Sequence, residues 1–258
     1  MLSEIRFRVV RIFIAMGLLT FVCMSLGVSL INLNGYEMPT LHIDTFNNLS
    51  VQIISLLKND LIPNNVNLVQ TAPGQSFYAQ LYVALIVGLV CALPLIYREF
   101  IAFINPALYH HENKVIKKTL IPMILLFILG CVFSYNIVIP YTLEFLYKYG
   151  QSIEITSFFE ITSFVTFTLN MLVVFGFSFQ IPIIMWAITK SGLVERAFWK
   201  NNIGYIVIFL IIIGALLTPD GSGITMWFIT IPLIVLYIAG LAVIRFDSML
   251  PIIDQNQR

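Results

Sequence analysis

Charged side chains are scarce in this sequence. Only 10% of its 258 residues are Asp, Glu, Lys or Arg, whereas 59% are hydrophobic. The mean hydropathy is +0.92, and an average soluble domain carries about 25% charged residues. The composition therefore excludes an ordinary soluble domain and predicts a protein of the lipid bilayer.

Basic clusters, disulfide frameworks and intramembrane histidines are also missing. The net charge is only +1 and no basic cluster occurs, so the sequence lacks the electrostatic footprint of a nucleic-acid-binding protein. Its three cysteines all fall in apolar runs, and their odd number argues against a disulfide framework or metal site. His42, His110 and His111 lie between the apolar runs, which excludes a serine-histidine pair inside the membrane. We therefore expect no enzymatic chemistry, no cofactor and no metal.

Six uncharged apolar runs approach the ~20 residues that an α-helix needs to cross ~30 Å of hydrocarbon. They cover residues 12–33, 76–97, 119–140, 161–188, 203–217 and 224–244. Lipid offers the backbone no hydrogen-bond partners, so each run should be a helix. We expect an all-α, polytopic protein with a single membrane domain over residues 1–258. The fifth run is short, because its 15 residues reach only ~22 Å at ~1.5 Å per residue.

The basic residues indicate the orientation of these helices. Twelve of the fourteen lie in the N-terminus, the second and fourth loops and the C-terminus, and only Lys58 and Lys148 lie in the other loops. Cytosolic segments carry the excess of Lys and Arg, so both termini are expected in the cytosol. In the long first external loop, Phe46, Leu49, Ile53 and Leu57 recur at helical spacing. This pattern predicts an amphipathic helix that ends before Pro63.

Polar residues inside the apolar runs are few, and most are expected to hydrogen-bond to a neighbouring helix. This is the interpretation for Gln80, Asn136 and Asn170. Gln180 differs because it directly precedes Ile181-Pro182. Proline removes a helical hydrogen bond and exposes carbonyls, which creates a place for a polar partner.

Two carboxylates, Glu4 and Glu112, are expected to face the cytosol, where a cationic ligand would meet them. The alternative is local pairing, of Glu4 with Arg8 at i, i+4 spacing and of Glu112 with Lys114 or Lys117. Spacing alone favours the local pairs.

Five segments resemble, in order, motifs of the TatC family, the receptor subunit of the twin-arginine protein translocase. They are "LSEIRFR", "PLIYREFIAFINPALYHHE", "FSY", "FGFSFQIP" and "LLTPD", and the resemblance extends from Leu2 to Phe246. The positions that match the motifs are Glu4, Arg6, Arg8, Pro94, Phe103, Pro106, Leu108, Tyr109, Glu112, Tyr135, Phe179, Gln180, Pro182 and Asp220.

The resemblance implies a receptor for twin-arginine signal peptides and the core subunit of a translocase that exports folded proteins. It implies a place in the cytoplasmic membrane of a prokaryote, self-assembly in a larger complex and small single-span partners of the TatA and TatB type. The glutamates matching Glu4 and Glu112 hold the arginine pair in that family, which reverses the preference for local pairing. The other matching residues of the first two segments are signal-peptide-binding residues by the same resemblance, apart from Pro94.

The resemblance also assigns Gln180, Phe179 and Pro182 to docking of a partner helix, although the family usually has glutamate where this chain has Gln180. Pro94, Tyr135 and Asp220 are matched as family positions with a structural or functional role. The alternative function is a small-solute or ion transporter. Such a protein should carry a charged residue or a symmetrically broken helix at mid-membrane, and the sequence shows neither.

Overall fold

The computed structural model describes residues 2–33, 36–62, 66–104, 113–152, 158–190, 194–218 and 223–249. The chain packs as two compact units, and each is described by itself. The first unit comprises Met1–Ile124 and Ile139–Asn170, and the second comprises Leu125–Val138 and Met171–Arg258.

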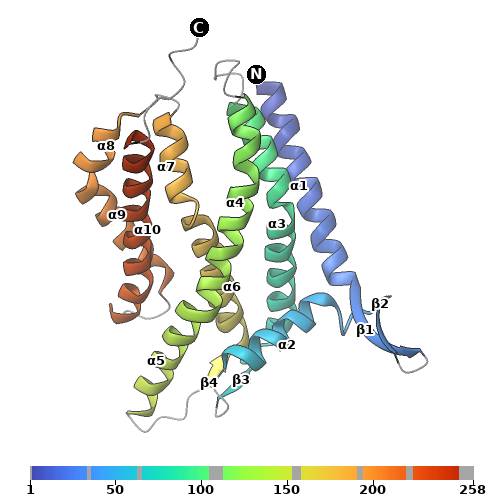
Figure 1. The fold of residues 1–258 in the computed structure, drawn as a ribbon. Coiled ribbons are helices and arrows are strands. Elements are labelled where there is room, and N and C mark those ends of the chain that lie inside the picture. The colour runs from blue at the N-terminus through green and yellow to red at the C-terminus, as the bar shows by residue number, and fades with distance from the viewer. Residues whose placement is uncertain are drawn as a thin grey trace. The chain divides into compact units, whose positions relative to one another are not determined.

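The first unit contains helices and two short sheets (Figure 1). Its elements are α1 (Leu2–Ser25), β1 (Leu26–Leu33), β2 (Tyr36–Ile43), α2 (Leu49–Leu61), β3 (Asn67–Val69), α3 (Gln75–Ile104), the first part of α4 (Asn113–Phe133), α5 (Ile139–Gln151), β4 (Phe158–Glu160) and the first part of α6 (Ile161–Ser178). Strands β1 and β2 pair antiparallel, and β3 pairs parallel with β4. Helix α3 forms the core, where Ala79, Val83 and Ala84 are fully buried.

The second unit is helical in its described residues. Besides the later parts of α4 and α6 it contains the π-helix η2 (Ser134–Val138), α7 (Ile181–Lys190), α8 (Arg196–Asn201), α9 (Ile203–Leu217) and α10 (Ile224–Met249). Helix α10 packs against both α7 and α9. The core of this unit contains Met171 and Phe175 of α6 with Ile229 and Leu233 of α10, and all four residues are fully buried.

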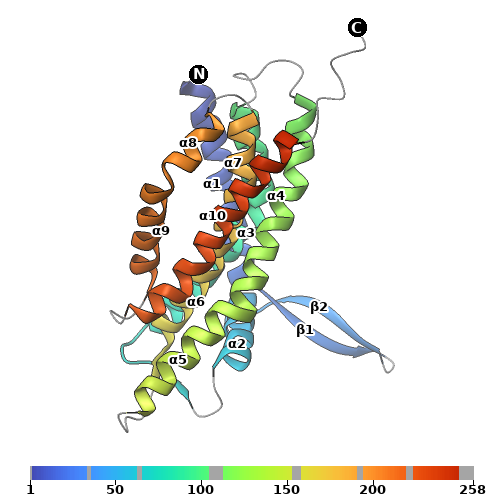
Figure 2. The same cartoon turned by 60° about the vertical axis from the view of Figure 1, so that its left-hand side comes forward.

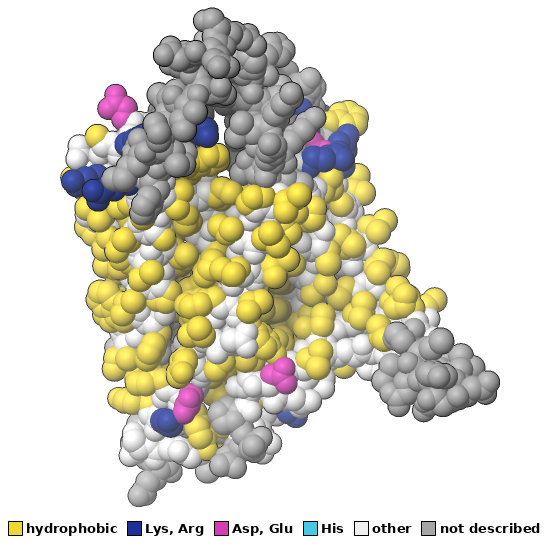
Figure 3. All heavy atoms as spheres, viewed as in Figure 1, with side chains coloured by type: hydrophobic (Ala, Val, Ile, Leu, Met, Phe, Trp, Pro, Cys, Tyr) yellow, Lys and Arg dark blue, Asp and Glu magenta, His cyan; other side chains and the backbone are white. Residues whose placement is uncertain are grey.

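Five segments of the described residues are long and apolar enough to cross a membrane. They are Arg6–Ser25, Gln75–Glu99, Ile121–Gln151, Ile161–Lys190 and Ile224–Arg245, and Ile203–Leu217 is a shorter apolar helix. In the face seen in Figure 3, hydrophobic side chains cover the middle, and the Lys and Arg side chains lie above and below this apolar band. Each of these segments overlaps one of the six expected runs, and Ile203–Leu217 coincides with the expected short fifth run.

The protein is mostly helical rather than all-α, and the first run differs most from the expectation. Helix α1 ends at Ser25, and residues expected to complete a span to position 33 form strand β1 instead. The two strands are separated by Asn34-Gly35 in the sequence, the dipeptide typical of two-residue hairpin loops. The hairpin extends away from α1 in both ribbon views (Figures 1 and 2), and His42 lies in β2 rather than in a loop.

The expected amphipathic helix is confirmed as α2, but its buried face is shifted. Asn48 caps the helix by accepting a hydrogen bond from the Val51 backbone N–H at 3.1 Å, so Phe46 lies outside the helix and is 91% exposed. The buried stripe is Ser50, Ile54, Leu57 and Leu61.

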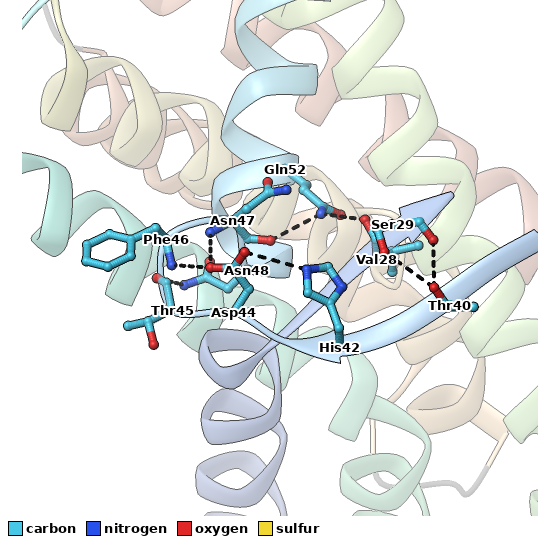
Figure 4. A network of polar contacts seen from close by, with 10 residues as sticks. All are labelled: Val28, Ser29, Thr40, His42, Asp44, Thr45, Phe46, Asn47, Asn48 and Gln52. Carbon is cyan, nitrogen blue, oxygen red and sulfur yellow. Dashed lines mark hydrogen bonds and ion pairs between the residues drawn. The ribbon is translucent and has the colours of Figure 1, made fainter. Parts of the chain in front are cut away.

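Hydrogen bonds at the start of α2 hold it to the hairpin (Figure 4). The Gln52 side chain donates to the Val28 carbonyl of β1 at 2.8 Å. Asp44 accepts from the backbone N–H groups of Phe46 and Asn47 at 2.8 and 3.1 Å, and these bonds lower the pKa of its carboxyl. The loop before α2 is therefore held by hydrogen bonds from its own backbone to the Asp44 side chain.

Candidate functional site

Helices α1 and α3 pack closely along their length in the first unit. At Gly88 of α3 an added Cβ would lie 2.7 Å from Thr20 Oγ1 and 3.0 Å from the Met16 carbonyl oxygen. Only a residue without Cβ permits this approach, as is common between membrane helices. Thr20 of α1 thus lies beside Gly88, while Arg11 contacts Glu99. The two helices are therefore antiparallel, and α1 begins beside the end of α3.

A buried carboxylate joins these two ends. Glu99 of α3 is only 6% exposed, and its Oε1 accepts hydrogen bonds from Arg11 Nη1 at 2.7 Å and from Arg98 Nη2 at 3.1 Å. Arg8 Nη1 donates to the Glu99 carbonyl oxygen at 3.3 Å and lies 3.9 Å from its Oε2. A buried charge requires such partners, so this arginine cluster fixes the start of α1 against α3.

Only two of the predicted signal-peptide residues beyond the arginines fall in described elements. Glu4 lies in α1 and Phe103 in α3, but only their helical placement is described. Pro106, Leu108, Tyr109 and Glu112 lie outside the described residues.

The two arginines of the N-terminal motif behave differently. Arg6 is exposed and Arg8 is half-buried. Arg8 reaches across to Glu99 on α3, a partner that the i, i+4 spacing with Glu4 does not reveal.

A second polar network occurs where β3 meets β4. Glu160 accepts hydrogen bonds from Ser163 Oγ at 2.6 Å, from Thr71 Oγ1 at 3.2 Å and from the Gln75 amide. Bonds from the Ser163 and Thr71 hydroxyls lower the pKa of this half-buried carboxyl most. The network ties the start of α6 to the start of α3.

The helix break predicted at Ile181-Pro182 is confirmed in the second unit. Helix α6 ends at Ser178 and α7 begins at Ile181. The Gln180 N–H donates to the Phe177 carbonyl at 2.9 Å, and its own carbonyl accepts from Ile184 N–H at 2.9 Å. Pro182 has no N–H to continue the ladder.

The predicted docking residues at this break are largely enclosed within the chain. Phe179 is 9% exposed, and Gln180 is 1% exposed, while Pro182 is half-buried. The ring of Phe179 lies 5.6 Å from that of Phe133 on α4. A partner helix would therefore meet the surface next to Gln180 before the amide itself.

Two of the three further family positions lie in described elements, Pro94 in the first unit and Tyr135 in the second. Pro94 lies inside α3 and is exposed, and Tyr135 lies in η2 and is half-buried. Asp220 falls outside the described residues.

Two of the polar residues inside the apolar runs can be compared with the structure, and both are exposed there. Asn170 accepts a hydrogen bond from Tyr82 of α3 at 2.5 Å, so the predicted bond to a neighbouring helix is confirmed. Asn136 instead donates to the Val132 carbonyl, four residues earlier in its own helical segment, at 2.8 Å. The expected partner on another helix is therefore wrong.

Comparison with protein families gives one assignment over most of the chain. Residues 1–232 match the model described as Sec-independent protein translocase protein (TatC). The chain belongs to the TatC family. The assignment lends no support to a solute or ion transporter, and TatC is a family of protein translocation components rather than enzymes.

Relatives named TatC match most of the chain. The Sec-independent protein translocase protein TatC of Cenarchaeum symbiosum (strain A) is 43% identical over 244 residues, covering 93% of this chain and 91% of the relative. TatC of Aquifex aeolicus (strain VF5) is 32% identical over 188 residues, covering 72% of this chain and 78% of the relative.

The fold also matches a solved TatC structure. A crystal structure described as the twin-arginine translocase receptor TatC superposes with a TM-score of 0.79 at 26% identity, covering 96% of this chain and 99% of the other. The chain is therefore a multi-pass membrane protein with the TatC fold.

Sequence reasoning missed Glu99 as a functional candidate in this TatC protein. It directly follows Arg98 at the end of an apolar run, which makes it look like half of a solvated charge pair. The scarcity of charged residues could have identified Glu99 from the sequence, because an acidic residue that borders a membrane span is a candidate for a buried ion pair.

Proposed function

We propose that this TatC-family protein receives twin-arginine signal peptides of folded cargo proteins on its cytosolic face. The binding site would lie where α1 begins and α3 ends, with Glu4 and Glu112 as the carboxylates that bind the arginine pair. In this role the protein is the core subunit of a translocase that exports folded proteins.

The arginine cluster at Glu99 is the observation that carries this proposal. It places the start of α1 beside the end of α3 in the first unit. Glu4 precedes Arg8 by one helical turn, and residues 105–112 follow α3 directly. Both glutamates therefore belong to chain segments that start from the same end of the α1–α3 pair.

The chemistry of the two sides is complementary. A guanidinium presents a planar fork of N–H donors to carboxylate oxygens, and such charge-assisted bonds contribute about 1.5–3 kcal/mol each. Lysine offers a point charge without that fork. In the sequence, Phe103 and Tyr109 are aromatic residues of the kind on which an arginine stacks, and Pro106 and Leu108 are apolar.

Both termini are proposed to face the cytosol. The excess of basic residues in the terminal segments and in the second and fourth loops supports this orientation, and the arginine cluster lies near the N-terminal end of α1. Six spans result if the 15 residues of Ile203–Leu217 cross a locally thinned bilayer, since they reach only ~22 Å. The compartment is the cytoplasmic membrane of a prokaryote.

Small single-span subunits of the TatA and TatB type are the proposed partners in the membrane. Their helix would dock at the break between α6 and α7. Phe177 and Ile184, each 41% exposed, flank buried Gln180 and offer an apolar surface there. Self-assembly into a larger complex completes the proposal.

A peptide titration tests the receptor function. The full-length protein in lipid nanodiscs is titrated with a fluorescent signal peptide carrying Arg-Arg and with its Lys-Lys variant. We expect about tenfold or greater preference for Arg-Arg, because losing one bidentate contact costs about 1.4 kcal/mol or more. Equal binding of both peptides would refute recognition of the arginine pair.

A further inference from the structure

One carboxylate in the first unit serves three guanidinium groups. Glu99 accepts from Arg11 at 2.7 Å and Arg98 at 3.1 Å, and Arg8 lies 3.9 Å from its second oxygen. Arg98 is a neighbour in sequence, but Arg8 and Arg11 come from α1. The chain thus gathers its own arginines on a carboxylate that is 6% exposed.

Arg8 has a second carboxylate within sequence reach. It follows Glu4 by four residues in α1, and a glutamate four residues before a basic residue is the favourable order for a helical ion pair. Glu4 is also one of the two carboxylates proposed for the signal peptide. Although the resemblance counts Arg8 among the signal-peptide-binding residues, it carries the same charge as the arginines of the peptide. Any pairing of Arg8 with Glu4 would therefore compete directly with an arginine of the peptide.

We propose that Glu99 is a positioning residue that withdraws the chain's own Arg8 from Glu4 and so keeps Glu4 available to a guanidinium ligand. The inference rests on the proposed function. Glu99 itself does not touch the peptide; it acts by holding the Arg8 guanidinium against α3, through the carbonyl contact at 3.3 Å and the carboxylate contact at 3.9 Å.

Removing the negative charge of Glu99 has two consequences at this site. The Arg8 guanidinium loses its carboxylate partner on α3 and becomes a competitor for Glu4. Arg11 and Arg98 lose their shared acceptor as well, so the positive charge that opposes an incoming arginine pair increases. Together these effects should weaken peptide binding by about threefold to tenfold, given the modest energies of partly exposed charge pairs.

The decisive comparison uses Glu99→Gln with and without Arg8→Gln, in the full-length protein in nanodiscs. We expect Glu99→Gln to weaken Arg-Arg peptide binding, and the added Arg8→Gln to restore at least half of the loss on a logarithmic scale. Glu144→Gln is the matched control, because Glu144 also pairs with a basic residue, Lys148, at 2.6 Å. We expect this variant to bind the peptide as tightly as the unchanged protein does.

A purely structural Glu99 predicts a different result. If the carboxylate merely fastens α1 to α3, Arg8→Gln removes a second fastener, and the double variant binds no more tightly than Glu99→Gln. That result, or unchanged binding by Glu99→Gln, would overturn the inference.

Two arms keep the test decisive. Should Glu99→Gln fail to fold, Glu99→Asp replaces it, since the shorter side chain loses the 3.9 Å contact with Arg8 first and should show the same relief by Arg8→Gln. The Lys-Lys peptide separates the two proposals. If the unchanged protein does not distinguish the peptides, the proposed function fails; if it does and Arg8→Gln brings no relief, only the role of Glu99 fails.

Discussion

Gly130 of α4 should tolerate no side chain, because α4 and α6 touch through it in the second unit. An added Cβ would lie 2.5 Å from the Phe175 carbonyl oxygen and 3.0 Å from the Gly176 Cα. Both obstacles are backbone atoms, so the helices themselves must separate to restore ordinary contact. Overpacking of this kind costs about 1–3 kcal/mol.

Gly17→Ala isolates the steric part of this cost. Gly17 also lies inside a helix, but nothing lies within 4 Å of an added Cβ there. Both substitutions gain about 1 kcal/mol of helix propensity, so the difference between their unfolding free energies leaves the steric term.

Denaturant titration in mixed micelles should therefore place Gly130→Ala about 1–3 kcal/mol below Gly17→Ala in unfolding free energy. Equal stability of the two variants would refute the close α4–α6 contact.

Two further predictions concern polar contacts. Tyr237→Phe should lower the unfolding free energy by about 1 kcal/mol, because the Tyr237 hydroxyl donates to the Trp199 carbonyl at 2.6 Å; Tyr205→Phe, at a residue 77% exposed, should change little under the same denaturant titration. Glu160 has a pKa below its ordinary 4.5 because hydroxyl groups donate to it. Its stabilisation is thus present above pH 4.5 and lost as the pH falls through the lower folded pKa. The hydrogen-exchange protection factor of β3, which is the intrinsic exchange rate at each pH divided by the measured rate, should therefore fall on acidification in the unchanged protein but not in Glu160→Gln.

The helical spans were predictable from the sequence, since lipid leaves an uncharged apolar run no alternative to a helix. The break at Pro182 was equally accessible, because a missing N–H is a local property. The start of α2 was harder to predict from the sequence. Helical spacing alone placed Phe46 in the buried stripe, but the cap at Asn48 begins the helix later and shifts the buried face by one residue.

The arginine cluster lay beyond sequence reasoning for a different reason. Arg11 and Glu99 are 88 residues apart in the chain, so no local spacing connects them. The pair Glu4 and Arg8 has the spacing of an ion pair, yet Arg8 contacts α3. The partner that Arg8 contacts on the other helix is a largely buried carboxylate, which needs partners of opposite charge. The hairpin likewise depended on pairing between β1 and β2 that an apolar run does not reveal.

Coupling between one peptide arginine and Glu112 tests the central claim most directly. Binding of the Arg-Arg peptide and its single Arg→Gln variants is measured for the unchanged protein and for Glu112→Gln, giving a double-mutant cycle for each arginine. We predict a coupling free energy of about 1 kcal/mol or more for one of the two arginines. The same cycles are measured with Glu4→Gln. If the effects of the protein and peptide substitutions are additive for both arginines in both sets of cycles, the result contradicts a site built from these carboxylates.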